Sequence, residues 1–379
     1  MSMRHTAATA SSPRRHWTVR SRRRPHSLVF WLLAVALAVP AGLSAQPFGT
    51  YTVFSGNGSA GASNGDLEVP DSPALNPAGP ITIEGWVSLS TPFGGTSTCR
   101  SLIGKNFHQS YWVGVCGSTL RAYLRGDGTF RDAGTVPAGQ WTHFAVTYDG
   151  ANQLHYINGE LIHAPFAVTG PPAASTAPVE IGGDFSYPFS PNGAVTEFRL
   201  WNVARTVDDI RGTINVPLTH AQPGLVAVWS LGGANDPVGG HNGTFHGTVS
   251  ALAPPAIISC GSSTTSALCL DSSFFITVSW RTGAPPGTPA TSGPGHVVVA
   301  GPGSGIFWFF SSDNWELMVK VINGCALNSS FWLFSAATTN VFYRMDVTDV
   351  RNGITKVYFN YTGPPAPAVT DTVAFPNSC

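Results

Sequence analysis

The sequence predicts an all-β protein with two domains, a larger sandwich followed by a smaller sandwich-like one. Glycine (42 residues) and proline (30 residues) are abundant and only 11% of the chain is charged, which is typical of many short strands joined by tight turns. Apolar and polar residues alternate with the period of two that strands require, and helical periodicity is scarce. About 330 residues follow the N-terminal leader, more than one ordinary core accommodates.

Residues 1–45 have the three parts of a secretory signal peptide. This segment contains no acidic residue and seven arginines, and an apolar run over 28–39 then leads through Pro40 and mostly small residues to Ala45. A membrane anchor is the alternative, but the run is shorter than the roughly 18 residues that a span needs. We therefore expect a cleaved signal, a mature chain without a membrane span, and a protein that is secreted or held in the periplasm or cell envelope.

Removal of the leader changes the charge balance of the chain. Taking its seven arginines from the 20 basic residues leaves 13, against 20 acidic residues, so the formal net charge of the mature part is −7. Nucleic acids and anionic membranes are bound through clustered lysine and arginine. The charge therefore argues against both as the main partner.

Six cysteines lie in the mature part, and an even count in an exported protein predicts disulfides. Cys99 and Cys116 bracket two hairpin arms symmetrically, so they would face each other with Cβ atoms about 4–5.5 Å apart. The remaining four cysteines allow three pairings. A zinc site is the alternative for these four, but no C-x-x-C spacing occurs among them. The pairings that we favour are Cys260–Cys269 and Cys325–Cys379.

The larger domain shows strands and turns in regular succession. Asn158-Gly159 separates two short apolar runs and predicts a type I′ hairpin, because both positions need a positive φ. The best helix candidate is one turn over residues 207–211 with Thr206 as its N-cap. The clearest strand sequences are residues 81–87, 141–148, 154–157, 197–201 and 225–229.

Four phrases in this domain carry a family resemblance. They are Ile-Thr-Ile-Glu-Gly-Trp-Val (81–87), Gln-Trp-Thr-His-Phe-Ala-Val-Thr-Tyr-Asp-Gly (140–150), Leu-His-Tyr-Ile-Asn-Gly-Glu-Leu (154–161) and Glu-Phe-Arg-Leu-Trp-Asn (197–202). In this order and spacing they resemble the LamG-like jelly roll of the concanavalin A-like lectin/glucanase superfamily, over nearly all of residues 50–248. The resemblance implies a jelly-roll sandwich over 46–253 in which the strand at 225–229 lies near the first strand. It also implies binding outside the cell, with enzymes as a subset.

A proline-bearing linker over 254–258 leads to a second all-β domain over 259–379. Alternation is clear over 316–321, 341–348 and 355–361, and Asn352-Gly353 predicts a hairpin between the last two. Residues 306–310 are apolar on both faces, which indicates a central strand. The arrangement resembles a β-domain at the ends of secreted bacterial proteins that has no assigned activity, and so it implies a bacterial source.

The sequence contains none of the catalytic patterns that this resemblance would lead one to seek. Retaining β-glucanases of this fold carry E-x-D-x-x-E on one strand, whereas Glu84 and Glu197 stand alone here. Nucleophile-elbow, H-E-x-x-H and P-loop motifs are also absent from the sequence. His143, His155 and His163 lie on strands, where packed or surface histidine is the simpler interpretation. We therefore expect a protein that is not an enzyme.

Calcium is implied by the resemblance, but two of the expected carboxylates are missing. Phe54-Ser55-Gly56 replaces Phe-Asp-Gly, and Thr196-Glu197 replaces Asp-Glu. Four aspartates could compensate, although aspartate is also an ordinary turn residue. We expect no metal and no cofactor. The four aspartates are Asp66, Asp71, Asp149 and Asp184.

Two loops combine aromatic and polar side chains as a glycan site would. The first, residues 184–192, is too long for a tight turn, and the second is the hairpin tip at 107–111. Loops on a rigid sandwich often carry function. The alternative is that the rings fold back as covers of the sandwich. The candidate ligand-binding residues are Phe185, Tyr187, Phe189, Asn192, Phe107, His108 and Tyr111.

The sequence therefore favours a secreted, non-catalytic binding or adhesion module for extracellular carbohydrate or protein. A structural or envelope-associated assembly protein is the alternative, and a glycan-active enzyme with an unrecognised site is the third. Exposed aromatic rings in a groove would favour the glycan binder, and a broad flat apolar patch the structural role. Converging carboxylates would favour the enzyme.

Overall fold

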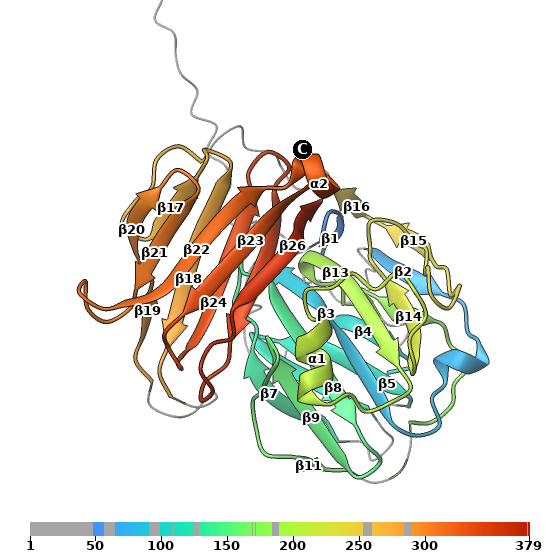
Figure 1. The fold of residues 1–379 in the computed structure, drawn as a ribbon. Coiled ribbons are helices and arrows are strands. Elements are labelled where there is room, and N and C mark those ends of the chain that lie inside the picture. Colours follow the sequence, from blue (N-terminus) through green and yellow to red (C-terminus); the bar gives the residue numbers. More distant parts are fainter. Residues whose placement is uncertain are drawn as a thin grey trace, which may run out of the picture. The chain divides into compact units, whose positions relative to one another are not determined.

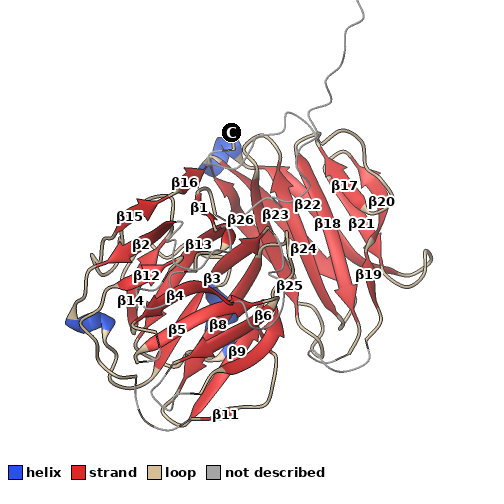
Figure 2. Ribbon diagram, turned by 180° about the vertical axis from the view of Figure 1, so that it is seen from behind, coloured by secondary structure: helices blue, strands red, loops and turns tan. Residues whose placement is uncertain are grey.

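The computed structural model describes two β-sandwiches in sequence (Figures 1 and 2). The predicted leader (1–45) and linker (254–258) lie outside the described residues, so the predicted domain boundaries stay predictions. Both sandwiches belong to one compact unit, Pro40–Cys379. The described residues are 48–56, 65–90, 99–107, 109–124, 129–168, 170, 172–183, 189–252, 260–283, 290–376 and 378–379.

The first sheet of the larger sandwich contains nine strands within the described residues, and its pairs are antiparallel. In spatial order it runs β10 (Glu160–Leu161), β9 (Asn152–Ile157), β8 (Thr142–Tyr148), β3 (Ile81–Leu89), β13 (Asn192–Trp201), β1 (Tyr51–Ser55) and β16 (Val249–Leu252), while β11 (Phe166–Ala167) pairs with β9 and β14 (Leu225–Trp229) with β13. The predicted strand at 225–229 therefore exists. It pairs with β13 beyond the part that pairs with β1, and the strand on the other edge of β1 is β16.

The second sheet packs against the first through a continuous apolar core. Its spatial order is β15 (Thr244–Gly247), β2 (Gly65–Val69), β12 (Val179–Ile181), β4 (Cys99–Lys105), β5 (Tyr111–Cys116), β6 (Thr119–Tyr123) and β7 (Arg131–Thr135). A short 3₁₀ turn, η1 (Pro73–Leu75), follows β2. Ile83, Phe144 and Val146 of the first sheet and Leu67 and Ile103 of the second are all fully buried in this core. Alternation along each strand produces the arrangement, because every second side chain faces the opposite sheet.

The local predictions for this sandwich are confirmed. Cys99 and Cys116 lie opposite each other in the β4–β5 hairpin and form a disulfide. Asn158 and Gly159 have φ values of 51° and 75° between β9 and β10. Helix α1 (Val207–Thr213) starts at Thr206, whose hydroxyl accepts from the backbone N–H of Asp209 in a capping box, and it extends two residues beyond the predicted turn.

The smaller sandwich also consists of two antiparallel sheets. The third sheet runs β17 (Ala267–Leu270), β18 (Phe274–Arg281), β24 (Phe342–Asp349) and β25 (Ile354–Asn360), with β19 (Ser292–Pro294) paired to β18. The fourth runs β20 (His296–Gly301), β21 (Ser304–Trp308), β22 (Trp315–Asn323), β23 (Ser330–Ala337) and β26 (Val369–Pro376), and α2 (Cys325–Asn328) follows β22. The predicted all-β fold with two sandwiches is thus confirmed.

Its disulfides and its central strand follow the predictions. Cys260–Cys269 and Cys325–Cys379 are both bonded, and every described cysteine is paired. β21 is an inner strand of the fourth sheet, as the apolar run predicts. The predicted hairpin between β24 and β25 exists, although Gly353 (φ 72°) and not Asn352 takes the left-handed conformation.

Apolar contacts join the two sandwiches over the outer face of the first sheet. Val357 of β25 is fully buried in a cluster that contains Trp86 and Trp141, and Phe359 packs on its margin. The guanidinium of Arg344 donates to the backbone oxygen of Trp141 at 2.6 Å, while Arg344 is only 4% exposed. A large part of this face is therefore closed by the second sandwich.

Helix α1 and the residues after it close more of the same face. Ile210 of α1 packs on Ala145 and Tyr156, and Leu218 packs on Trp201. Both faces of the first sheet are thus occupied, one by the core and the other by these covers. The outer face and the ends of the second sheet are the surfaces that this packing leaves for a ligand.

Candidate functional site

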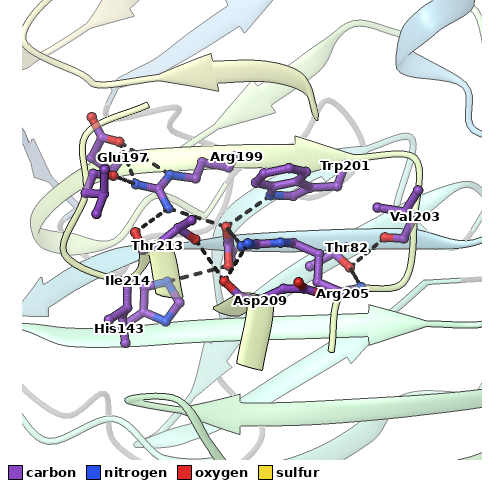
Figure 3. Close-up of polar contacts among 12 residues, drawn as sticks. Thr82, His143, Glu197, Arg199, Trp201, Val203, Arg205, Asp209, Thr213 and Ile214 are labelled. Carbon is purple, nitrogen blue, oxygen red and sulfur yellow. Dashed lines mark hydrogen bonds and ion pairs between the residues drawn. The ribbon is translucent and has the colours of Figure 1, made fainter. Parts of the chain in front are cut away.

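A buried charge cluster lies on the outer face of the first sheet. The Oε1 atom of Glu84 accepts hydrogen bonds from Nη1 of Arg205 (2.8 Å) and Nε1 of Trp201 (3.0 Å), and it lies 3.5 Å from Nη1 of Arg199. Arg199 also donates to Glu197 at 3.0 Å. Figure 3 shows these groups converging between β3, β13 and the segment that leads into α1. Two glutamates that stand alone in the sequence therefore share one arginine.

The side chains of the cluster are closed to solvent. Glu84 is 0% and Arg199 1% exposed, and Arg199 also donates to the backbone oxygens of Thr213 and Val216 behind α1. Burial lowers the pKa of His143, beside Glu84, well below its ordinary value, and the nearby guanidinium groups add to this effect. Arg199 and Arg205 donate to the backbone oxygens of Thr213 and Asp209, so the cluster links α1 to the first sheet.

An open polar cleft lies at one end of the second sheet. Its volume is about 620 Å³, within the range of small-molecule sites. Three segments far apart in sequence form it: the stretch around η1 after β2, the β4–β5 turn, and the residues before β12. Its lining residues are Asp71, Pro73, Asn76, Asn106, Gln109, Ala174, Ser175 and Thr176.

Hydrogen bonds between the three segments fix the polar side chains of the cleft. The amide nitrogen of Asn106 donates to Oε1 of Gln109 (2.9 Å) and to Oγ of Ser175 (3.0 Å). The amide of Asn76 donates to Oδ1 of Asp71 (2.8 Å), and its oxygen accepts from the backbone N–H of Ser175 (2.9 Å). Asn106 takes a left-handed conformation (φ 53°), which asparagine tolerates better than most residues. The lining is thus held in one arrangement.

Asp71 gives the cleft one carboxylate of fixed charge. The ammonium group of Lys105, whose side chain is fully buried, lies 2.6 Å from Oδ1 of Asp71 and also donates to the backbone oxygen of Ala177 at 2.5 Å. These hydrogen bonds lower the pKa of Asp71, so its carboxyl is ionised at neutral pH. Both amide hydrogens of Asn76 and both of Asn106 are used in hydrogen bonds within the protein. The cleft therefore combines amide and carboxylate acceptors with hydroxyl groups and the amide of Gln109.

The predicted hairpin-tip residues that the structure describes have different surroundings. Phe107 follows Asn106 and is half-buried, with its ring 5.1 Å from Trp112 and 5.5 Å from Phe130. Tyr111 is 0% exposed in the core and donates to the backbone oxygen of Leu75 at 3.2 Å, so its expected place in a ligand site is wrong. The reason is alternation: Tyr111 begins β5 on the same face as Val113. His108 lies outside the described residues.

The described end of the other predicted loop, residues 189–192, lies at the opposite end of β4. The ring of Phe189 is half-buried, 5.7 Å from the guanidinium carbon of Arg100, and its backbone oxygen accepts from Ser101 at 2.9 Å. Asn192 is the first residue of β13, and its backbone oxygen accepts from the N–H of Ser90. Phe185 and Tyr187 lie outside the described residues. The described residues of the two loops, Phe107 and Phe189, therefore lie at opposite ends of a seven-residue strand.

The aspartates that could have compensated for missing calcium ligands serve other purposes. Asp149 accepts from the backbone N–H groups of Ala151 and Asn152, an ordinary turn. Asp71 is held by Lys105, and Asp184 lies outside the described residues. Asp66 is buried on β2, next to β12. Within the described ranges, no three His, Cys, Asp or Glu side chains gather where they could hold a metal.

Sequence reasoning missed most of the cleft. Asn76, Asn106 and Ser175 are ordinary turn residues, and 69 and 99 positions separate the pairs that they form. Aspartate, asparagine, serine and proline in 71–76 predicted only a turn. In addition, the part of the chain that the structure describes holds no helix that is long and apolar enough to cross a membrane.

Comparisons with solved structures return jelly-roll proteins of low similarity. A Bacteroides ovatus protein provisionally described as carbohydrate-binding is 20% identical, with a TM-score of 0.44 over 54% of this chain and 60% of its own, so the chain spans less than two thirds of it. Domain 4 of a Geobacillus stearothermophilus extracellular arabinanase, in complex with arabinotriose, is 20% identical (TM-score 0.31; 38% and 70% covered). The binding domain of botulinum neurotoxin DC is 10% identical (TM-score 0.35; 85% and 84% covered).

These scores are too low to carry an argument about function. A comparison with curated proteins finds no match. A family model, in contrast, matches residues 60–211, which include the charge cluster and the cleft. That model is Laminin_G_3, of the concanavalin A-like lectin/glucanases superfamily, and the predicted resemblance to this superfamily is confirmed over these residues.

Proposed function

We propose that this protein is an exported, non-catalytic carbohydrate-binding protein whose first sandwich binds a neutral glycan in the polar cleft. The observation that carries the proposal is the fixed set of Asp71, Asn76, Asn106 and Ser175. A sugar presents hydroxyl groups that donate and accept in fixed directions. The cleft offers acceptor oxygens that are already ordered by these internal hydrogen bonds, which reduces the entropic cost of binding.

The charge of the cleft supports a neutral ligand. Asp71 is the carboxylate among the lining residues, and the buried ammonium group of Lys105 compensates its negative charge. A carboxylate that is already paired still has lone pairs that accept hydroxyl hydrogens. An anionic ligand would meet Asp71, so a neutral sugar fits this cleft better.

The placement of carboxylates supports a binding protein over a hydrolase. Glycoside hydrolysis generally uses two carboxyl groups on either side of the scissile bond. The described lining of the cleft has one, Asp71, and the converging pair Glu84 and Glu197 is buried and neutralised by arginine. The glutamate pair therefore has no access to a substrate.

Export is supported by the leader and by the disulfides. The three bridges form in oxidising compartments, as the signal-like residues 1–45 also predict. A bacterial envelope or medium agrees with both, and the resemblance of the second sandwich to domains of secreted bacterial proteins stays a prediction.

A glycan array of the mature chain, followed by calorimetry on each hit, tests the proposal. Asn106→Ala/Gln109→Ala should weaken a hit about tenfold or more, since each variant removes ordered hydrogen bonds worth roughly 1 kcal/mol. The matched control is Asn202→Ala/Gln222→Ala, which removes the same two side-chain types at exposed positions. A hit that is instead lost in Tyr187→Ala/Phe189→Ala would move the site to the 184–192 loop, and a folded protein without any hit would reject the proposal.

A second candidate function is self-assembly through the fourth sheet. Its outer face exposes Trp315 (55%), Met318 (49%) and Ile322 (38%), and large exposed apolar patches mark contact surfaces. Sedimentation velocity of the mature chain tests this candidate. Met318→Glu/Ile322→Glu should shift an oligomer to monomer, and a monomeric parent at high concentration would remove the candidate.

A further inference from the structure

A second pocket of about 470 Å³ lies where the two sandwiches meet, away from the polar cleft. The β9–β10 hairpin and helix α1 of the first sandwich form two of its walls, and the residues after β25 form the third. The proposed function does not use this pocket. Its lining residues are Tyr156, Glu160, Leu161, Thr206, Val207, Arg211, Tyr361 and Thr362.

Arg211 is fixed in the wall of this pocket. Its Nε donates to the backbone oxygen of Gly159 at 2.9 Å, and its guanidinium carbon lies 3.6 Å from the centre of the Tyr361 ring. A guanidinium held by stacking keeps its planar fork in one orientation. Such a fork matches a carboxylate, which it binds through two parallel hydrogen bonds.

The lining of the pocket contains one carboxylate, that of Glu160, and one guanidinium, that of Arg211. Glu160 is ion-paired with Arg281 of the second sandwich, so these two compensate each other. Arg211 is the further cation in the wall. On α1, Asp209 serves the N-terminal cap, and neither it nor Asp208 lines the pocket. Because Arg281 holds the ion pair with Glu160, the guanidinium of Arg211 can pair with an anionic ligand.

The remaining walls suit the body of a small sugar. The rings of Tyr156 and Tyr361 and the side chains of Leu161 and Val207 are apolar, as the faces of a pyranose ring are. Thr362 donates its hydroxyl to the backbone oxygen of Gly283 at 3.2 Å, so its oxygen can still accept from a ligand. Pockets of this volume accept molecules of one or two rings.

We propose that this interdomain pocket is a second binding site, which takes a sugar acid with its carboxylate on Arg211 and its ring against the side chains of Leu161 and Val207. The choice of a sugar rests on the proposed function of the first sandwich, whereas the carboxylate contact rests on Arg211 alone. The two sites differ in chemistry, because the cleft presents a carboxylate and the pocket a guanidinium.

Calorimetric or NMR titration of the full mature chain with glucuronate, and with glucose as the matched neutral sugar, tests the proposal. Glucuronate should bind about tenfold or more tightly than glucose, because the charge-assisted pair adds roughly 1.5–3 kcal/mol. Arg211→Gln should abolish this preference. Arg121→Gln is the matched control, since Arg121 is ion-paired to Asp132 on the second sheet and should be neutral for glucuronate binding.

A second variant protects the test from a folding defect in Arg211→Gln. Val207→Trp fills the pocket while it keeps Arg211, and it should weaken glucuronate binding without unfolding the chain, as circular dichroism verifies. Three results would overturn the proposed site in the pocket. They are equal affinity for the two sugars, no glucuronate binding by the folded chain, and unchanged glucuronate binding in both variants. Loss of glucuronate in Asn106→Ala/Gln109→Ala alone would place the acid in the cleft and also overturn it. Glucuronate binding with no neutral glycan hit would reject the cleft and leave the pocket standing.

Discussion

The two sandwiches treat polar and apolar groups in opposite ways. The first buries charged side chains under a cover, with Glu84, Arg199 and His143 each at most 1% exposed, and keeps its polar cleft at one end. The second exposes Trp315, Met318 and other large apolar side chains on the outer face of its fourth sheet. A sandwich can therefore cover the outer face of one of its sheets with another part of the chain, as the first does, or leave an outer face exposed, as the second does. The difference agrees with our proposals of a ligand site at the end of the first sandwich and a contact face on the second.

The largest change in stability should follow from removing the charge of Glu84, at the centre of the buried cluster in the first sandwich. Glu84→Gln keeps the shape but leaves Arg205 and Arg199 without their shared carboxylate, so the free energy of unfolding should fall by about 3 kcal/mol or more. Denaturant unfolding measures the change. Glu68→Gln is the control, because the Glu68 side chain is 42% exposed and should cost less than about 0.5 kcal/mol. Equal losses in the two variants would show that the cluster does not support the cover.

The next largest effect should be a loss of stability at acidic pH, caused by a buried histidine of the first sandwich. Burial lowers the pKa of His155 to about 3, whereas an unfolded histidine titrates near 6.5. Between these values the unfolded chain binds a proton that the folded chain does not, so stability is present above pH 6.5 and is lost as pH falls. His155 alone should remove about 2 kcal/mol between pH 7 and pH 5. NMR titration of the imidazole signals checks the cause, and a His155 pKa near 6.5 in the folded protein would contradict it.

The smallest effect should come from the exposed face of the second sandwich. Met318→Glu places a charge on a side chain that is 49% exposed and should change the free energy of unfolding by less than about 0.5 kcal/mol. Val319→Glu, one position along β22, buries the same charge in the core and should prevent stable folding. Thermal unfolding of both variants measures the contrast. A large loss in Met318→Glu would mean that this face is covered within the chain.

Sequence reasoning reached the features that depend on neighbours along the chain. The Asn158-Gly159 turn, the Thr206 cap and the Cys99–Cys116 pair were predictable because turn geometry, capping and hairpin symmetry are local. Alternation from Tyr111 to Val113 also pointed Tyr111 inward, but placing Tyr111 in the turn concealed this. The assignment of one position to a loop or to a strand therefore decided whether the ring was exposed.

The features that sequence reasoning missed depend on distant partners. Glu84 and Arg205 are 121 positions apart, and Asn76 and Ser175 are 99 positions apart. Nothing in a turn-forming asparagine shows which other turn it will contact, because strand order determines that. The joint between the sandwiches was missed for the same reason, since Arg344 finds its partner, the backbone oxygen of Trp141, 203 positions away.

The β4–β5 hairpin has one further consequence for how the protein should be handled. Its base is closed covalently by Cys99–Cys116, and its tip carries Asn106 and Gln109 into the cleft. A reductant would break this disulfide without changing a residue of the cleft, and the hairpin tip would then lose part of the support that orders it. Affinity for a glycan would in this way depend on the redox state of the surroundings, so a binding assay in dithiothreitol should give a weaker affinity than the same assay without a reductant.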